Sequence, residues 1–87
     1  MSEETISPEN KFLEFVLSNL LEHPTDIKIE EIHDELGILF EVTVHEEDMG
    51  KVIGKGGQTI QSLRTILRLM GSKRQERINL KVLEPQK

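Results

Sequence analysis

The sequence predicts a single α+β domain in the order helix, strand, strand, helix, helix, strand. Three observations predict this class. Apolar residues recur at helical spacing in 8–23 and 58–71, they alternate with polar residues in 26–30, 38–44 and 77–83, and glycines separate two helical patterns at 54–57. Because 87 residues leave room for one domain, we expect it to span 7–84, with a three-stranded sheet packed against helices on one face. Residues 1–6 are expected to form a disordered tail and residues 85–87 a frayed one.

The first helix is expected to begin near Pro8. Ser7 is a typical N-cap, proline suits the first turn, and Glu9 places a negative charge near the positive helix end. A wide apolar stripe follows and stops at His23-Pro24; its members are Phe12, Leu13, Phe15, Val16, Leu17, Leu20 and Leu21. The stripe indicates that this helix packs on the core. We expect all three phenylalanines of the chain, Phe12, Phe15 and Phe40, to be core residues.

Two alternating segments predict an antiparallel hairpin. Ile27 and Ile29 alternate with charged residues, and after a polar turn at 33–37 the alternation resumes with apolar residues on one side: Ile38, Phe40, Val42 and Val44. Ile32 breaks the phase of the first strand. The sequence therefore leaves two alternatives, a bulge at Ile32 or a strand that ends before it.

The second half predicts two helices and a third strand. Residues 46–53 suit a short helix, with Gly54 as its left-handed C-terminal glycine. From Gln58 onward a second helix has a buried seam of Ile60, Leu63, Leu67 and Met70, and Gly71-Ser72 is expected to end it. Residues 77–83 alternate again, which predicts a strand with Ile78, Leu80 and Val82 on one side.

Charge divides the chain into two unlike parts. The formal net charge is −5, but residues 1–48 hold two lysines against fourteen acidic residues, whereas residues 49–87 hold nine basic residues against two acidic ones. A dipolar chain of this kind can present a local basic surface to a phosphate backbone although its total charge is negative.

The segment Gly54-Lys55-Gly56-Gly57 can approach an anion closely, because three of its four residues lack a Cβ atom. The helix that follows directs its free N–H groups into the same space. Lys51 and the pair Arg64/Arg68 extend the positive surface. A plain glycine turn without a ligand is the alternative. Gly56 follows Lys55 where a P-loop needs Ser or Thr, and no strand precedes the loop, so a nucleotide-hydrolysing site and a dinucleotide fingerprint are both excluded.

Residues 52–60, VIGKGGQTI, match the V-I-G-x-x-G-x-x-I signature of KH domains. The predicted element order resembles the type II, prokaryotic KH arrangement, in which a GXXG loop between two helices clamps the backbone of about four single-stranded nucleotides. The resemblance covers nearly the whole chain. It is closest to the small bacterial single-KH RNA-binding proteins of the KhpA type.

This resemblance implies that the chain binds single-stranded RNA with low sequence specificity, as an RNA chaperone or post-transcriptional regulator. The implied RNA-binding residues, with the basic helpers, are Lys51, Val52, Ile53, Gly54, Lys55, Gly56, Gly57, Gln58, Arg64 and Arg68. Val42 and Val44 would add aliphatic surface near the bases, or be plain core. The family typically carries a bulkier polar residue at Gly56 and a basic one at Gln58, so a weaker affinity is expected here.

The resemblance also implies self-association or pairing with a larger Jag-type KH protein. Ile66 and Leu69 widen the apolar face of the last helix, so they form either a dimer surface or additional core. A protein-interaction module with a weak or inactive loop is therefore the alternative function.

Other classes of function find little support in the sequence. There is no cysteine, and His23, His33 and His45 stand in separate elements without ligand spacing, so we expect no metal, no cofactor and no catalysis. The N-terminus lacks the pattern of a signal peptide, and no apolar run is long enough to span a membrane. We expect a cytoplasmic protein.

Overall fold

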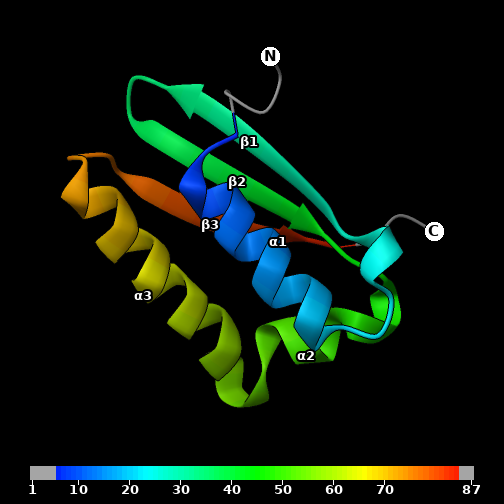
Figure 1. Ribbon diagram of the computed structural model, residues 1–87. Helices are drawn as coiled ribbons and strands as arrows, with labels where there is room; N and C mark the ends of the chain where they lie inside the picture. Colours follow the sequence, from blue (N-terminus) through cyan, green and yellow to red (C-terminus); the bar gives the residue numbers. More distant parts are fainter. Residues whose placement is uncertain (1–5, 85–87) are drawn as a thin grey trace.

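The computed structural model, which describes residues 6–84, has the predicted order of helices and strands (Figure 1). Short 3₁₀ turns, labelled η, join some of them. The elements are α1 (Pro8–Leu20), η2 (Pro24–Asp26), β1 (Lys28–Asp34), β2 (Gly37–Thr43), η3 (Glu46–Asp48), α2 (Met49–Ile53), η4 (Lys55–Gly57), α3 (Gln58–Lys73) and β3 (Ile78–Leu83). The predicted tails lie outside the described residues except for Ile6, which lies just before the α1 N-cap residue Ser7.

The three strands form one mixed sheet in the order β1-β2-β3. β1 pairs with β2 as an antiparallel hairpin, and β2 pairs with β3 in parallel. A parallel pair requires a crossover, and α2, the glycine loop and α3 provide it. Figure 1 shows the helices on one face of the sheet, as predicted. No helix in residues 6–84 is long and apolar enough to cross a membrane.

The hydrophobic core lies between the helices and the covered face of the sheet. β2 contributes most regularly, since Ile38, Phe40 and Val42 are buried in alternation along it. The helices add Leu13 and Leu17 from α1 and, from α3, the predicted seam of Ile60, Leu63 and Leu67, while Met70 is half-buried. The seam fixes which face of α3 meets the sheet.

Both alternatives for Ile32 are wrong. β1 continues to Asp34 in an unbroken register with β2, and Ile32 is the partner of Leu39. These two side chains lie on the face of the sheet that the helices do not cover, because their neighbours Phe40 and Ile38 point into the core. An apolar cross-strand pair on the open face therefore explains the broken phase.

In α1 the cap is as predicted, since the Ser7 hydroxyl accepts a hydrogen bond from the amide of Asn10 (3.1 Å). The helix ends at Leu20. The expectation that Phe15 belongs to the core is wrong, because 69% of its surface is exposed. Phe15 is two residues away from both Leu13 and Leu17, which places it on nearly the opposite side of the helix from these buried leucines, toward the solvent.

Two predicted helix boundaries also differ. Residues 46–53 form a 3₁₀ turn followed by one turn and a half of α-helix, and the terminal Gly54 has φ 79° and ψ 171° rather than the left-handed helical conformation. α3 does not end at Gly71-Ser72 but continues to Lys73. Gly71 is buried, and a Cβ there would overlap the side chain of Ile78, so this glycine serves close packing.

Candidate nucleic-acid interface

The loop of residues 54–57 joins α2 to α3 at one end of the molecule (Figure 1). Its three glycines have backbone φ values of 79°, 62° and 78°, which residues other than glycine rarely adopt. At Gly54 a Cβ would also overlap the side chain and the amide of Thr59. The Gly54 amide donates to the carbonyl of Gly50 (2.8 Å), so the chain leaves α2 and turns directly into the loop.

The tip of this loop carries free hydrogen-bond donors and a free cation. Lys55 and Gly56 are exposed, and within residues 6–84 no group accepts a hydrogen bond from either amide. The Lys55 ammonium has no ion pair in that range. A bond from the Gly57 amide to the Gly54 carbonyl (3.1 Å) holds the turn. Free amides beside a lysine can bind an anion such as phosphate.

The residues around the loop differ in what they can offer. Lys51 is paired with Glu22 (Nζ to Oε2, 2.7 Å), and this hydrogen bond lowers the pKa of the Glu22 carboxyl. Gln58 is exposed at the start of α3. Val52 is a buried core residue, so its side chain holds the loop in place from the core side, whereas Ile53 is half-buried.

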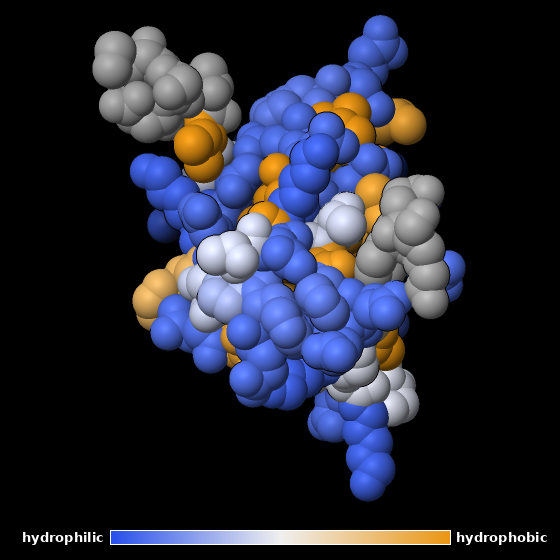
Figure 2. All heavy atoms as spheres, turned by 90° about the vertical axis from the view of Figure 1, so that its right-hand side faces the viewer, coloured by the Kyte–Doolittle hydropathy of each residue, from blue (hydrophilic) through white to orange (hydrophobic). Residues whose placement is uncertain are grey.

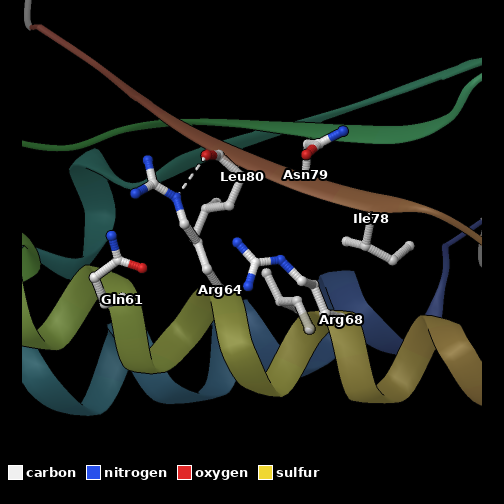
Figure 3. Close-up of a pocket in the computed structure, with 7 residues that line it drawn as sticks. Gln61, Arg64, Arg68, Ile78, Asn79 and Leu80 are labelled. Atoms are coloured by element: carbon white, nitrogen blue, oxygen red, sulfur yellow. Dashed lines mark hydrogen bonds between the residues drawn. The ribbon is translucent and has the colours of Figure 1, made fainter.

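A groove between α3 and the free edge of β3 follows the loop and has a volume of about 290 Å³. Figure 3 shows Gln61, Arg64 and Arg68 projecting from α3 toward this strand. Arg64 Nε donates to the backbone carbonyl of Leu80 (3.3 Å), which fixes the arginine across the groove. On β3, Asn79 belongs to the lining of the groove, although its side chain points away from α3 (Figure 3).

The sequence pattern did not single out Gln61 and Asn79. Their signals are present, since Gln61 lies one helical turn before Arg64, and Asn79 is the outward residue between buried Ile78 and Leu80. Only the packing of α3 beside β3 brings them together. Val42 and Val44, for which two roles were open, are buried core residues.

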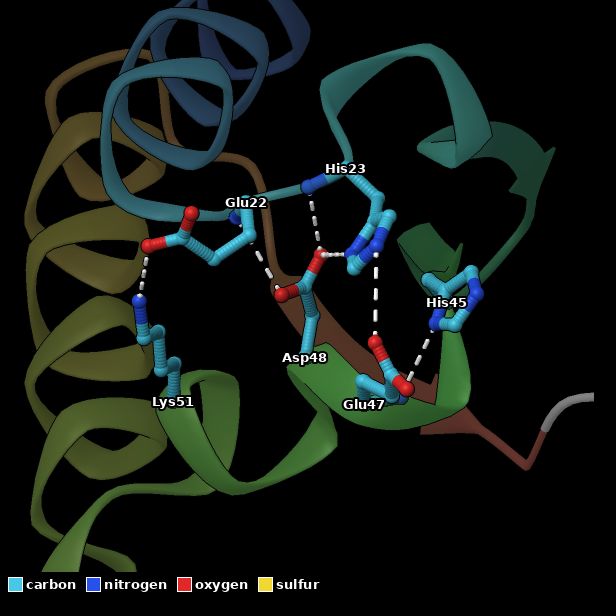
Figure 4. Close-up of polar contacts among 6 residues, drawn as sticks. All are labelled: Glu22, His23, His45, Glu47, Asp48 and Lys51. Atoms are coloured by element: carbon cyan, nitrogen blue, oxygen red, sulfur yellow. Dashed lines mark hydrogen bonds and ion pairs between the residues drawn. The ribbon is translucent and has the colours of Figure 1, made fainter.

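A second polar cluster surrounds Asp48 (Figure 4). This carboxylate is buried and accepts hydrogen bonds from the backbone amides of Glu22 (3.1 Å) and His23 (2.9 Å). It also contacts Nδ1 of the His23 ring (3.2 Å). Burial alone would raise the pKa of Asp48, but these bonds outweigh it and lower the pKa. Asp48 thereby fastens the segment after α1 to the start of α2.

The same cluster brings together His23, His45 and Glu47, which sequence reasoning placed apart. Their candidate ligand atoms lie within 4.8 Å of one another. However, the two rings are stacked with centroids 3.9 Å apart, and His45 Nδ1 accepts a bond from the Glu47 amide (3.0 Å). In-plane lone pairs of stacked rings do not converge on one ion, so this arrangement suits packing.

The end of the molecule that faces the viewer in Figure 2 is mainly hydrophilic, with hydrophobic residues only in separate small areas.

Comparisons with known proteins agree on one family. Residues 10–82 match the family model described as "KhpA/KhpB, KH domain". Proteins named "RNA-binding protein KhpA" are 35% identical in Chlamydia pneumoniae (85% of this chain and 95% of the relative) and 35% identical in Halalkalibacterium halodurans (83% and 95%). The protein of that name in Listeria monocytogenes is 33% identical over 79% of this chain and 91% of its own length. The match includes the loop and both helices that flank it.

Proposed function

Because the chain belongs to the KhpA/KhpB family of KH domains, we propose that it binds the backbone of single-stranded RNA through the loop of residues 54–57. The observation that carries this proposal is the exposed loop tip, where the amides of Lys55 and Gly56 have no acceptor within residues 6–84. Phosphate oxygens would accept from these amides, and the Lys55 ammonium would add charge. The family is not one of enzymes, and the proposed role requires no catalytic group.

The residues around the loop would contribute to RNA binding in different ways. Arg64, Arg68, Gln61 and Asn79 line the groove in which the bases would lie. Gln58 directly follows the loop and would lie near the bound phosphates. Lys51 would contribute less, because its ammonium already forms an ion pair with Glu22. The buried side chain of Val52 would support the loop rather than reach the bases, whereas half-buried Ile53 would offer aliphatic surface beside the loop.

We expect low sequence specificity for two reasons. Backbone amides and lysine read phosphate, which carries no sequence information. Aromatic side chains for base stacking are missing from the residues that line the groove and the loop. This favours a cytoplasmic RNA chaperone or post-transcriptional regulator of many transcripts over a reader of one motif.

The test replaces Lys55 and Gly56 together by Asp and measures binding to a mixed pool of single-stranded RNA. We expect at least a tenfold loss of affinity, because the change removes one cation and adds two anions at the phosphate site. The charge-matched control is Lys11→Asp with Lys28→Gln, two exposed lysines on α1 and β1 that lack ion pairs in the described chain. Equal affinities of the loop variant and the wild type, both folded by circular dichroism, would exclude the loop as the site.

A second function, self-association, is favoured by exposed apolar residues on the outer surface of the helices. Ile66 and Leu69 are 41% and 67% exposed, so their alternative role as core is wrong. α1 and α3 lie side by side (Figure 1), and Phe15 adds a further exposed ring. We propose that a second copy of the chain covers this surface, and that a larger Jag-type KH protein competes for it.

Sedimentation of the wild type beside Leu69→Glu tests this second proposal. We expect a dimer for the wild type and a monomer for the variant. Leu36→Glu is the matched control, because Leu36 is similarly exposed (73% against 67% for Leu69) but lies in the β1–β2 turn rather than on α3. A monomeric wild type at high protein concentration contradicts the homodimer and leaves RNA binding unaffected.

A further inference from the structure

We propose that the RNA strand extends past the loop and the adjoining groove into a second subsite at the far end of α3, where Arg77, Gln75 and Ser72 would hold one further nucleotide. The inference rests on the proposed function, since it concerns the same ligand. It makes the binding surface longer than the four-nucleotide clamp that the loop alone would provide.

The first argument is the continuity of the groove. The cavity beside Arg64 adjoins another of about 590 Å³, since both are lined by Arg68, Ile78 and Asn79. Along α3 the lining residues are Gln61, Arg64, Arg68 and Ser72. Their spacing of three, four and four residues keeps them on one helix face over about 16 Å. A strand that enters at the loop can therefore follow one face of α3 to its end.

The second argument is the supply of unused donors at the far end. Within residues 6–84, neither Arg68 nor Arg77 forms an ion pair or a side-chain hydrogen bond. Arg74 stands nearby but is already bonded to Glu9. One acid, Glu76, lines the same cavity beside Arg68 and Arg77, so this lining holds two cations and one anion. On its other side Arg77 lines a hollow with Asp34 and Glu35, so these two acids lie near it as well.

The third argument is that the platform is preformed. The turn after α3 is held by amide-to-carbonyl bonds from Arg74 to Gly71 (2.9 Å), from Gln75 to Ser72 (3.0 Å) and from Glu76 to Gly71 (2.8 Å). Gln75 has φ 61°, a value that is uncommon for residues other than glycine. A fixed turn loses little entropy when a ligand binds beside it.

The chemistry of these groups fits a nucleotide. A guanidinium binds phosphate through two hydrogen bonds and stacks on a base, and the amide groups of Gln75 and Asn79 can pair with base edges. The C-terminal end of α3 carries a partial negative charge that disfavours phosphate. Arg68 and Arg77 are therefore what would allow a nucleotide to bind there, and of the two only Arg77 is absent from the lining of the groove beside Arg64.

Fluorescence anisotropy with labelled oligouridylates of four and eight nucleotides tests the subsite. We compare the wild type with Arg77→Gln and with Lys73→Gln, a control that removes the same charge from a neighbouring exposed residue outside both cavities. We expect Arg77→Gln to weaken the eight-nucleotide complex roughly five- to tenfold and the four-nucleotide complex less than twofold. The salt slope for the longer RNA should also fall by about 0.7 in magnitude.

The outcomes separate this inference from the proposed function. If Arg77→Gln binds the longer RNA as tightly as the wild type, the second subsite is wrong while binding at the loop stands. If Lys73→Gln weakens it equally, the effect is one of general charge and the subsite is again wrong. If the wild type binds neither oligonucleotide, both the proposed function and the subsite fail. A longer RNA offers more positions at which the protein can bind. Because each variant is compared with the wild type on the same RNA, this factor is the same for both and does not affect the comparison.

Discussion

Single residues far apart in the chain fasten this small fold together. Glu9 is fully buried and accepts two hydrogen bonds from Arg74 (2.6 and 3.0 Å), which raise the pKa of the arginine. The pair ties the first turn of α1 to the turn after α3. The sequence predicted only that Glu9 favours the positive helix end, because nothing in local spacing shows that a residue 65 positions later reaches it.

Asp48 is the second buried acid, and we predict that Asp48→Asn lowers the melting temperature by about 5 °C at pH 7. The amide of asparagine cannot accept from both the Glu22 and the His23 backbone as a carboxylate does. Because the pKa of Asp48 is lowered by folding, its stabilisation is fully present above about pH 5. It is lost as the pH falls through the ordinary value of 3.8 toward the folded value, so the two melting curves should converge in acid.

Asp26→Asn is the control for this measurement, since Asp26 lies in the neighbouring turn but is exposed. We expect it to leave the melting temperature unchanged within about 1 °C. A difference between Asp48→Asn and the wild type that stays constant from pH 7 to pH 3 would contradict an ionised Asp48 as the source of the stabilisation.

Among the elements, periodicity predicted β2, β3 and the seam of α3 correctly because one face of each is buried. It was less reliable where both faces carry apolar residues. β1 has Ile29 toward the core and Ile32 on the open face, and α1 has leucines buried beneath an exposed Phe15. A sequence shows that such residues are apolar but not which of them a neighbouring element will cover.

The two helical glycines should respond oppositely to alanine. We predict that Gly71→Ala destabilises the protein by about 1–3 kcal/mol, because the added methyl overlaps Ile78 and the Glu76 carbonyl in a packed site. Gly50→Ala, where nothing lies within 4 Å of the added atom, should be neutral or stabilising by up to about 1 kcal/mol. Chemical denaturation of both variants beside the wild type measures the two effects.

The Gly50 variant serves as the control, since both substitutions change helix propensity in the same direction. If both alanine variants prove more stable than the wild type, then β3 does not approach α3 as closely as the structure describes. If both are destabilised, the cost at Gly71 cannot be assigned to contact with Ile78.

At the scale of the whole molecule, the basic residues of the second half gather beside the glycine loop and along α3, while the first half carries the excess of acids. The net charge of −5 therefore does not predict how the protein meets RNA. What matters is where the cations lie: Lys55 stands in the loop that precedes α3, and Arg64 and Arg68 line the groove along that helix.

We predict a moderate salt dependence for RNA binding. If about three phosphates are neutralised, the logarithm of the affinity should fall against the logarithm of the salt concentration with a slope of roughly −2. Anisotropy titrations between low and near-physiological salt measure it. The variant Lys55→Gln should reduce the slope by about 0.7, whereas Lys81→Gln, on the open face of the sheet, should leave it unchanged. A salt-independent affinity would contradict phosphate contacts.

The sequence by itself determined the order of the elements, the cap of α1 and the position of the glycine loop. These features depend on local conformational preference and on the periodic burial of one face. Both are set by residues that lie close together in the sequence. Tertiary structure alone decided the groove, because its two walls come from residues 61–72 and 78–80 and meet only when β3 adds to the sheet beside α3. It also decided that Lys51 is paired with Glu22 while Lys55 has no ion pair within residues 6–84, since an ion pair depends on distances that packing sets.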